Sequence, residues 1–585
     1  MRRQRNAGLR KAAEPGVGPA AAVQGISAWF FLGTCAILRP PPDSMSNQFS
    51  WVTRFLERPH LIVAPVALLF LFVFVALGIG HGEFFSVGLI VGGLVAVALA
   101  LIMGRSYWLL IPLAFSAELP AIPLAGRLIE LAEAAIVLCT AIFILRMALR
   151  QQRLTVFRMS HAPALMFTAW AMFIFWENPV WLSVASGELG GARFYAKIVM
   201  ALAAFLIMAN QEIGERESRW IILLVLVGAG ISTVRNIAAF FIPALGGDAA
   251  MAASAVASAN AVMETDSYYS WHQYIAGVPI TVIVLLLSRY KAREIFTLER
   301  IRTLGLFLVC AVLVLLSGKR AGVASVPAYA VVATIIRKEF GYLALWLGGA
   351  VTAAILLVAG HGSLFHLPLT AQRALSWLPG QWDPELQSLE GGQDEFRSTL
   401  RRLAWEKIQR DPWIGQGYRV DMALIQQSMD IGGGGVEGQV LPFALGSAWH
   451  NTWLGYAADL GIPASILAGL IFLTFIKKGW RLSTQLPAGS WPATLAMYIT
   501  LVAILRLLTS HTSGHSANDQ FERWWMYGIL VSLAVKAAKD REAAASTGET
   551  SSPRSGEPLG LALPGLAPLR AGEPRRARRP TSVDS

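Results

Sequence analysis

A histidine and an asparagine stand side by side where a long apolar run begins. His450 and Asn451 open the stretch HNTWLGYAADLGIPASILAGL, whose apolar residues continue to Ile476. An imidazole can exchange a proton near neutral pH, because its ordinary pKa is about 6.5. A helix that begins with these groups and continues as hydrocarbon places polar chemistry at a membrane face.

Arginines collect in the segment directly before this helix. Residues 361–447 form the longest non-apolar stretch within the apolar region, and loops of that length are usually functional or disordered. Within 394–408 the apolar residues recur at helical spacing, and Arg397 and Arg401, four apart, share one face. A helix is therefore predicted here, ending before Pro412. A surface helix with solvated arginines is the alternative explanation.

Two cations lie on a tight turn between two apolar runs. Lys319 and Arg320 occur in LLSGKRAGVAS, where Gly318 and Gly322 let the backbones approach. Snorkelling to lipid headgroups is one explanation, since a cation at a span edge costs little. As an exception to the positive-inside rule, two cations on an external turn also indicate a site.

Composition defines the class of protein that positions these groups. The chain has 585 residues, of which 55% are hydrophobic and 15% charged, and its mean hydropathy is +0.52. These values indicate a polytopic membrane protein. The net charge of +12 does not indicate nucleic-acid binding, because Lys and Arg cluster in short connections between apolar runs. Cys35, Cys139 and Cys310 lie far apart in apolar runs, which favours neither a disulfide framework nor a thiolate metal site.

Successive apolar runs of about 20 residues predict an all-α polytopic fold with about 12–14 transmembrane helices and one large external, partly helical loop. Pro112, Pro120 and Pro123 interrupt the candidate span 107–125, and only a short connection separates the two spans within 303–336. The expected spans are 61–80, 84–103, 107–125, 128–149, 162–178, 194–210, 219–241, 273–289, 303–317, 321–336, 340–359, 453–476, 490–509 and 523–538.

Basic clusters orient these spans. Arg and Lys in 146–158, 289–302 and 477–481 mark three cytoplasmic connections. Alternation then places 242–272, which has no Lys or Arg, and 361–449 outside, with both termini in the cytoplasm.

The same pattern divides the chain into five regions. Residues 1–44 are either a signal-like segment or precede a true start at Met45. The tail is rich in Ser, Pro, Gly, Ala and Arg, which is typical of disorder. The expected regions are a cytoplasmic N-terminus at 1–60, a transmembrane bundle at 61–360, a periplasmic loop with a helix at 361–449, C-terminal transmembrane helices at 450–538 and a disordered basic cytoplasmic tail at 539–585.

These features together resemble the O-antigen ligase and polymerase-like membrane glycosyltransferases. The resemblance covers approximately residues 300–475, and its three motifs are specific in combination. The matching residues are His450, Asn451, Leu454 and Gly461 at the helix start, Ser317, Arg320 and Gly322 at an outer span junction, and Arg401, Trp405, Pro412, Gly415 and Gly417 on an external helix and the turn after it.

The resemblance implies a GT-C-like helix bundle and a glycosyltransferase that needs neither a metal nor another cofactor. The donor would be a glycan on undecaprenyl pyrophosphate, presented at the periplasmic face of the bacterial inner membrane. The acceptor would be a hydroxyl of the lipopolysaccharide core for a ligase, or the end of a growing polysaccharide for an O-antigen or exopolysaccharide polymerase. The sequence does not choose between them.

The resemblance also implies roles for the cations. Arg320 and Arg401 would hold the pyrophosphate, because a guanidinium binds phosphate oxygens in pairs and keeps its charge. Arg397 and Arg402 compete with Arg401 for the role on the external helix, and Lys319 would add charge beside Arg320. Stabilising the charge that develops on the leaving group is usually the largest catalytic contribution.

The resemblance implies that the residues at the start of the helix after His450 bind the acceptor. His450 would orient or deprotonate the acceptor hydroxyl, and Asn451 would fix the imidazole or bind sugar. Trp453 would stack on sugar, or it belongs to the aromatic belt at the membrane interface.

A transporter or flippase of lipid-linked oligosaccharide is the alternative from another class. Transporters carry charged residues inside their spans, and Glu118, Arg127, Glu130 and Glu133 lie within or beside expected spans. The sequence shows no internal repeat, and its unusual chemistry collects on the external side.

Overall fold

The computed structural model is almost entirely helical in the residues that it describes. Six of those helices are long and apolar enough to cross a membrane, and five shorter apolar helices accompany them. The expected all-α polytopic membrane fold is therefore confirmed. The residues described are 104–117, 122–124, 127–152, 159–179, 191–241, 271–418, 440, 444, 449–510 and 523–546.

Some expectations fall outside those residues. The total of about 12–14 spans stays a prediction for that reason. The segments concerned are the N-terminal region 1–60, the expected spans 61–80 and 84–103, the segment 242–270, most of 419–448, residues 511–522 and the tail 547–585.

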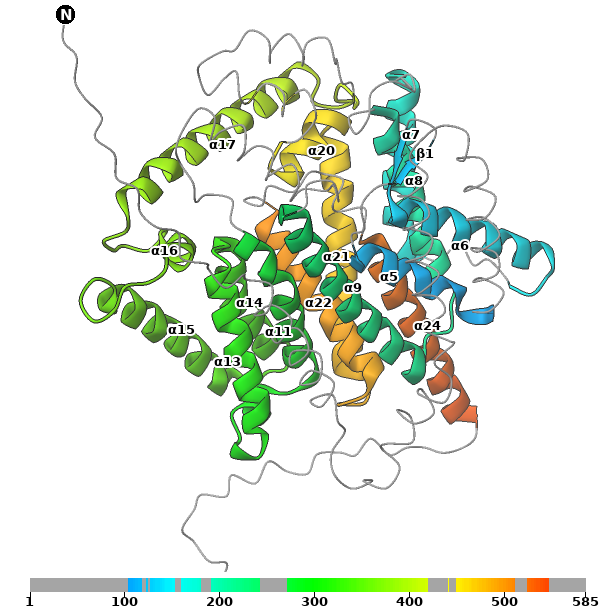
Figure 1. The fold of residues 1–585 in the computed structure, drawn as a ribbon. Helices are drawn as coiled ribbons and strands as arrows, with labels where there is room; N and C mark the ends of the chain where they lie inside the picture. Colours follow the sequence, from blue (N-terminus) through cyan, green and yellow to red (C-terminus); the bar gives the residue numbers. More distant parts are fainter. Residues whose placement is uncertain are drawn as a thin grey trace, which may run out of the picture. The chain divides into compact units, whose positions relative to one another are not determined.

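The chain divides into two compact units, Met1–Lys536 and Ala537–Ser585, and all packing described below lies in the first. Figure 1 shows the order of the elements along the chain. They are η3 (Gly104–Leu109), α5 (Leu110–Ala117), β1 (Ile122–Leu124), β2 (Arg127–Ile129), α6 (Leu131–Ala148), η4 (Met159–His161), α7 (Ala162–Glu177), α8 (Gly191–Ala209), α9 (Glu215–Phe241), η6 (Trp271–Ala276), α11 (Gly277–Arg289), α12 (Ala292–Ile295), η7 (Leu298–Arg300), α13 (Ile301–Leu316), α14 (Arg320–Ile336), α15 (Phe340–Gly360), α16 (Leu369–Leu375), α17 (Pro384–Arg410), α20 (Thr452–Leu460), α21 (Ile462–Gln485), α22 (Trp491–Thr509) and α24 (Trp524–Ser546).

Two helices in the C-terminal part of the chain form the centre of the packing. α21 and α22 lie side by side (Figure 1). α22 also contacts α9, α11 and α14, while α21 contacts α7. In α22, 61% of the apolar window is buried against protein, whereas in α15 the share is 6%. α22 is therefore an interior helix, and α15 leaves nearly all of its apolar surface for lipid.

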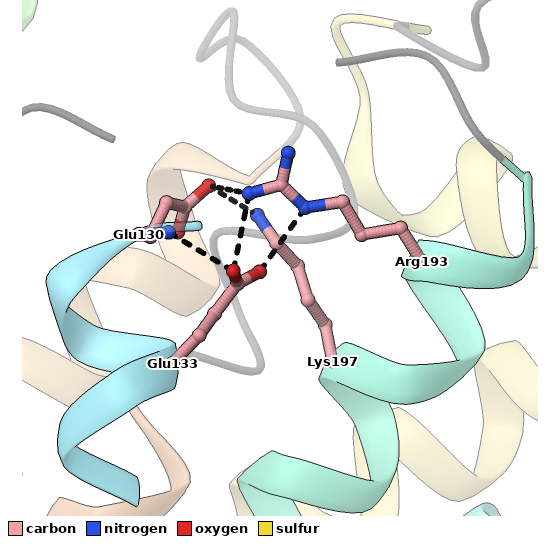
Figure 2. Close-up of polar contacts among 4 residues, drawn as sticks. All are labelled: Glu130, Glu133, Arg193 and Lys197. Atoms are coloured by element: carbon pink, nitrogen blue, oxygen red, sulfur yellow. Dashed lines mark hydrogen bonds and ion pairs between the residues drawn. The ribbon is translucent and has the colours of Figure 1, made fainter. Parts of the chain in front are cut away.

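Four charged side chains link the N-terminal ends of α6 and α8 (Figure 2). Arg193 pairs with Glu130 and Glu133 at 3.1 Å each, and Lys197 pairs with Glu130 at 2.8 Å. The backbone N–H of Glu130 donates to the Glu133 carboxylate at 3.0 Å, as part of a capping box. These two carboxylates, which supported the transport alternative, thus hold two helices together.

The expected span 107–125 is wrong in its C-terminal part. α5 ends at Ala117, and β1 then pairs with β2 in a short antiparallel hairpin. Pro123 lies opposite Leu128 in this hairpin. Proline has no backbone N–H and clashes with the preceding turn, so Pro123 is unfavourable within a helix.

The expected uninterrupted helix 453–476 is also wrong. It consists of α20 and α21, which meet at Gly461. Gly461 has a φ of +82°, a conformation that only glycine adopts without strain. The helix expected at 394–408 is confirmed but is longer, because α17 begins at Pro384. α24 continues to Ser546, beyond the expected end of its span at 538.

Close helix packing at Gly528 gives a test of the fold. A Cβ at Gly528 on α24 would collide with the Phe205 carbonyl and lie 2.7 Å from the Met208 Cβ, both on α8. We expect Gly528→Val to lower the free energy of unfolding by about 1–3 kcal/mol through overpacking. Thermal unfolding of the purified protein in detergent measures this. Gly305→Val on α13 is the matched control, because nothing lies within 4 Å of its Cβ position. Equal melting of both variants would contradict this packing.

Candidate active site

α17 packs along α20 through a small apolar core. Leu400, Ala404 and Ile408 on α17 and Ala457 and Ala458 on α20 are buried in one cluster. The first three residues are the helical stripe visible in the sequence. This contact brings the arginine-bearing helix to the mouth of the helix that follows His450-Asn451.

A buried ion pair fastens the two helices. The Lys407 ammonium lies 2.6 Å from one carboxylate oxygen of Asp459, and the Trp449 indole N–H donates to the other at 3.1 Å. The same ammonium lies 5.2 Å from the centre of the Trp449 ring. Asp459 is 0% exposed. A buried carboxylate is stable only when it is paired and hydrogen-bonded, so all three groups must be present together.

The turn after α17 is fixed against the α20–α21 junction by backbone contacts. The Gly417 N–H donates to the Asp459 carbonyl at 2.7 Å, and the Ile462 N–H donates to the Pro412 carbonyl at 2.8 Å. A Cβ at Gly461 would collide with the Trp413 carbonyl oxygen. Gly461 and Gly415, which the sequence resemblance singled out, therefore allow two backbones to touch.

Hydrogen bonds fix both sequence neighbours of His450. Its neighbour Trp449 is bound to Asp459, and its neighbour Asn451 caps α20 by accepting from the backbone N–H groups of Trp453 and Leu454 at 3.1 Å each. His450 has a φ of +51°, which is uncommon for a residue with a side chain and is frequent at functional sites. The half-buried imidazole lies edge-on to Phe396 of α17, with ring centres 5.9 Å apart.

Asn451 and Trp453 face the protein. The Asn451 amide oxygen serves the helix cap, so ligand contacts would fall to its amide nitrogen. The Trp453 ring packs edge-on to Phe472 at 5.8 Å, and its indole N–H donates to the Ser510 hydroxyl. This packing joins the start of α20 to the end of α22.

The three arginines of α17 occupy different sides of the helix. At about 100° per residue, Arg397 lies about 20° from Ala404 on the packed side, and Arg401 about 60° from it. Arg402 lies about 160° away, on the opposite side. Arg397 is half-buried and pairs with Asp394 at 3.9 Å, whereas Arg401 and Arg402 are exposed. Arg397 directly follows Phe396, the residue that contacts His450. Arg397 therefore adjoins the contact with the histidine, whereas Arg401 and Arg402 lie about 140° and about 120° around the helix from Phe396.

Arg320 and Lys319 lie at the N-terminus of α14, next to α16. The Arg320 Nε donates to the Arg373 carbonyl at 3.2 Å, and the Lys319 ammonium lies 5.7 Å from the centre of the Tyr274 ring. Helix N-termini carry partial positive charge, so two cations at this end of α14 add to that charge. An anion bound there would be favoured by the helix dipole and the cations together.

These positions can be compared with known families. A family model described as O-antigen ligase matches residues 305–469. The matched segment, which is similar to the O-antigen ligases, is called the O-antigen ligase domain. It runs from α13 to the first turns of α21 and includes Arg320, α17 and His450, so it carries every candidate site residue of the sequence resemblance. No curated protein matches the chain.

The O-antigen ligase domain contains functional positions that the sequence reasoning missed. Lys407 and Asp459 are far apart in sequence, so their pairing was not visible. One signal existed, because Lys407 follows the apolar stripe of α17 on nearly the same side. The described residues contain no group of three His, Cys, Asp or Glu that could hold a metal ion, and His511 and His515 lie outside them.

The buried ion pair can be tested by removing one partner. We expect Asp459→Asn to lower the free energy of unfolding by about 3–5 kcal/mol, because it leaves the Lys407 ammonium uncompensated. Thermal unfolding and limited proteolysis of α17 measure the effect. The double variant Lys407→Met with Asp459→Leu is expected to recover much of the loss, since no charge is then buried. Glu406→Gln, on the exposed side of α17, is the control. Wild-type melting of Asp459→Asn would show that the pair does not hold α17.

The contact at Gly461 can be separated from its backbone strain. Gly461 and Gly489 have φ values of +82° and +79°, so alanine is strained at both, but only Gly461 faces a backbone carbonyl. We expect Gly461→Ala to lower the melting temperature and to expose the turn after α17 to proteases. Gly489→Ala is expected to keep that turn protected, with a small loss of stability. Equal effects in both variants would mean that φ alone matters here.

Proposed function

We propose that the protein is a membrane glycosyltransferase that transfers a glycan from undecaprenyl pyrophosphate to an acceptor hydroxyl at the periplasmic face of the bacterial inner membrane. The observation that carries this proposal is the contact between α17 and the start of α20 inside the O-antigen ligase domain. It places a histidine beside the helix that carries Arg397 and Arg401. A proton acceptor next to phosphate-binding cations suits transfer from a lipid diphosphate.

The reaction is a single displacement at the anomeric carbon. The His450 imidazole takes the proton of the acceptor hydroxyl, and the hydroxyl oxygen attacks the anomeric carbon. The bond between that carbon and the diphosphate oxygen breaks, and its electron pair stays on the diphosphate. The anomeric configuration is inverted. General base catalysis of this kind contributes about 10²–10⁴-fold to the rate.

The cations act on the leaving group. Arg401 and Arg397 on α17, and Arg320 with Lys319 at the start of α14, stabilise the charge that develops on the diphosphate. Three of these side chains have contacts that limit their motion, namely Arg397 with Asp394, Arg320 with the Arg373 carbonyl and Lys319 with Tyr274. A charged side chain that is already held in place loses less conformational entropy on binding a ligand than a mobile one does.

The acceptor is either the lipopolysaccharide core or a growing polysaccharide chain. A ligase and a polymerase share the donor chemistry, and both belong to cell-surface polysaccharide biosynthesis. Both chain termini are placed in the cytoplasm and the site in the periplasm by the charge pattern of the connections. The transporter alternative gains no support, because Glu130 and Glu133 serve as ion-pair partners between α6 and α8.

A transfer assay tests the proposal. Purified protein in lipid nanodiscs is mixed with undecaprenyl-pyrophosphate-linked oligosaccharide and either acceptor, and the new glycosidic bond is detected by mass spectrometry. We expect His450→Ala to lower kcat about 10²–10⁴-fold with little change in the KM for donor. Arg401→Ala is expected to lower kcat/KM for donor roughly tenfold to a hundredfold.

Arg410→Ala is the matched control, because Arg410 is an exposed arginine on the last turn of the same helix. It is expected to retain wild-type kinetics. Movement of the lipid-linked glycan across the bilayer without any new glycosidic bond would overturn the enzyme assignment in favour of a transporter.

A further inference from the structure

Exposed apolar side chains gather directly after the end of α15. Leu364, Phe365 and Leu369 are exposed, Leu364 to 86%, and Trp377 is exposed just beyond the last residue of α16. These four residues are called the apolar cluster. Large exposed apolar surfaces usually mark a contact with a membrane or with another protein. The buried residues of α16 lie on its other side, where the helix packs against α13 and α14. α16 therefore turns its exposed side away from these two helices.

The backbone between α15 and α16 forms its hydrogen bonds internally. The donors are the N–H groups of Ser363, Leu364 and Phe365 to the Gly360 carbonyl at 3.3, 2.9 and 3.1 Å, of Gly362 to the Phe365 carbonyl at 2.9 Å, and of Leu367 to the His361 Nδ1 at 3.1 Å. Pro368 has no N–H to satisfy. A turn in water can leave its donors to the solvent, whereas a turn that enters lipid must bond them within the protein. This turn meets the stricter requirement.

The length of α15 places the apolar cluster near a membrane surface. α15 has 21 residues, and only 6% of its apolar window is buried against protein. At about 1.5 Å per residue it is about 32 Å long, close to the roughly 30 Å thickness of the hydrocarbon core. Leu364 comes four residues after Gly360, so it lies within about 14 Å of the end of the helix. The bonds of the turn to the Gly360 carbonyl keep it closer still.

The exposed side of α16 combines apolar and cationic groups in an order typical of a membrane surface. Leu369, Arg373 and Trp377 are four residues apart, so they share one side of α16 and the turn after it. Tryptophan is enriched at the boundary between membrane and water, and an arginine there reaches outward to the headgroups. Arg373 is the one charged residue in the sequence from 340 to 382. Contact through this segment is therefore mainly apolar and needs no anionic lipid.

We propose that residues 361–377 form an interfacial anchor, which inserts the apolar cluster among the lipids at the C-terminal end of α15. A lipid surface is the occupant because the cluster continues the lipid-exposed surface of α15. The anchor does not depend on the proposed function. It also bears on Arg320, because α16 supplies the Arg373 carbonyl that accepts from the Arg320 Nε at 3.2 Å. The anchor thus sets the level of Arg320 relative to the headgroups.

A depth measurement by electron paramagnetic resonance tests the anchor. Full-length Leu364→Cys carries a nitroxide in phosphatidylcholine nanodiscs. Its collisions with oxygen, which dissolves in lipid, are compared with its collisions with a water-soluble nickel complex. Leu356→Cys on α15 is the reference for lipid and Glu406→Cys on α17 the reference for water, because both side chains are exposed. We expect the label at Leu364 to lie between the two references, about 5–10 Å into the boundary between headgroups and acyl chains.

The remaining measurements define what would contradict the anchor. Cys139 and Cys310 are buried, and labelled wild-type protein measures any signal from native cysteines. Collision rates at Leu364 equal to those at Glu406 would overturn the anchor, because water would then cover the cluster. Low rates with both reagents, together with spin–spin broadening, would overturn it in favour of contact with a second copy of the chain. Thermal unfolding identifies a variant that does not fold, and Trp377→Cys is a second site at which the same depth is expected.

Discussion

The Asp459 carboxylate joins the two helices on which the candidate site is built. It sits in α20 with no exposed surface, and it receives the Lys407 ammonium of α17 and the indole N–H of Trp449. A charge in such a place is tolerated only with these partners. The pair therefore fixes where α17 lies, and it fixes Trp449, the residue next to His450. The position of the imidazole follows from an ion pair that takes no part in the chemistry.

Close backbone contacts at glycines hold the turn after α17 in place, in addition to the ion pair. The turn after α17 reaches the junction of α20 and α21 because Gly415 and Gly461 have no side chain there. The backbone hydrogen bonds that result, from Gly417 to the Asp459 carbonyl and from Ile462 to the Pro412 carbonyl, replace bonds that the broken helix cannot make. A helix break within a membrane protein thus becomes the anchor for the large loop.

Two groups of cations in the protein have different roles. Arg193 and Lys197 meet carboxylates and serve to pack α8 against α6. Arg320, Arg397 and Arg401 lie at the start of α14 and on α17, where the O-antigen ligase domain exposes polar chemistry. A diphosphate carries enough negative charge to require several cations from different elements, because no single helix face surrounds it. This explains why the candidate site draws on residues far apart in the chain.

The sequence by itself determined the class of fold, most span positions and the resemblance to the O-antigen ligases, because hydropathy and short motifs are local properties of the chain. It identified His450, Arg320 and the stripe on α17 for the same reason. Only the tertiary structure decided that Gly461 breaks the last helix of the motif and that Lys407 meets Asp459. Those outcomes depend on which helices touch, and contacts between distant segments leave no periodic mark in the sequence. The packing of α17 on α20 brings the arginine-bearing helix to the start of the helix that follows His450.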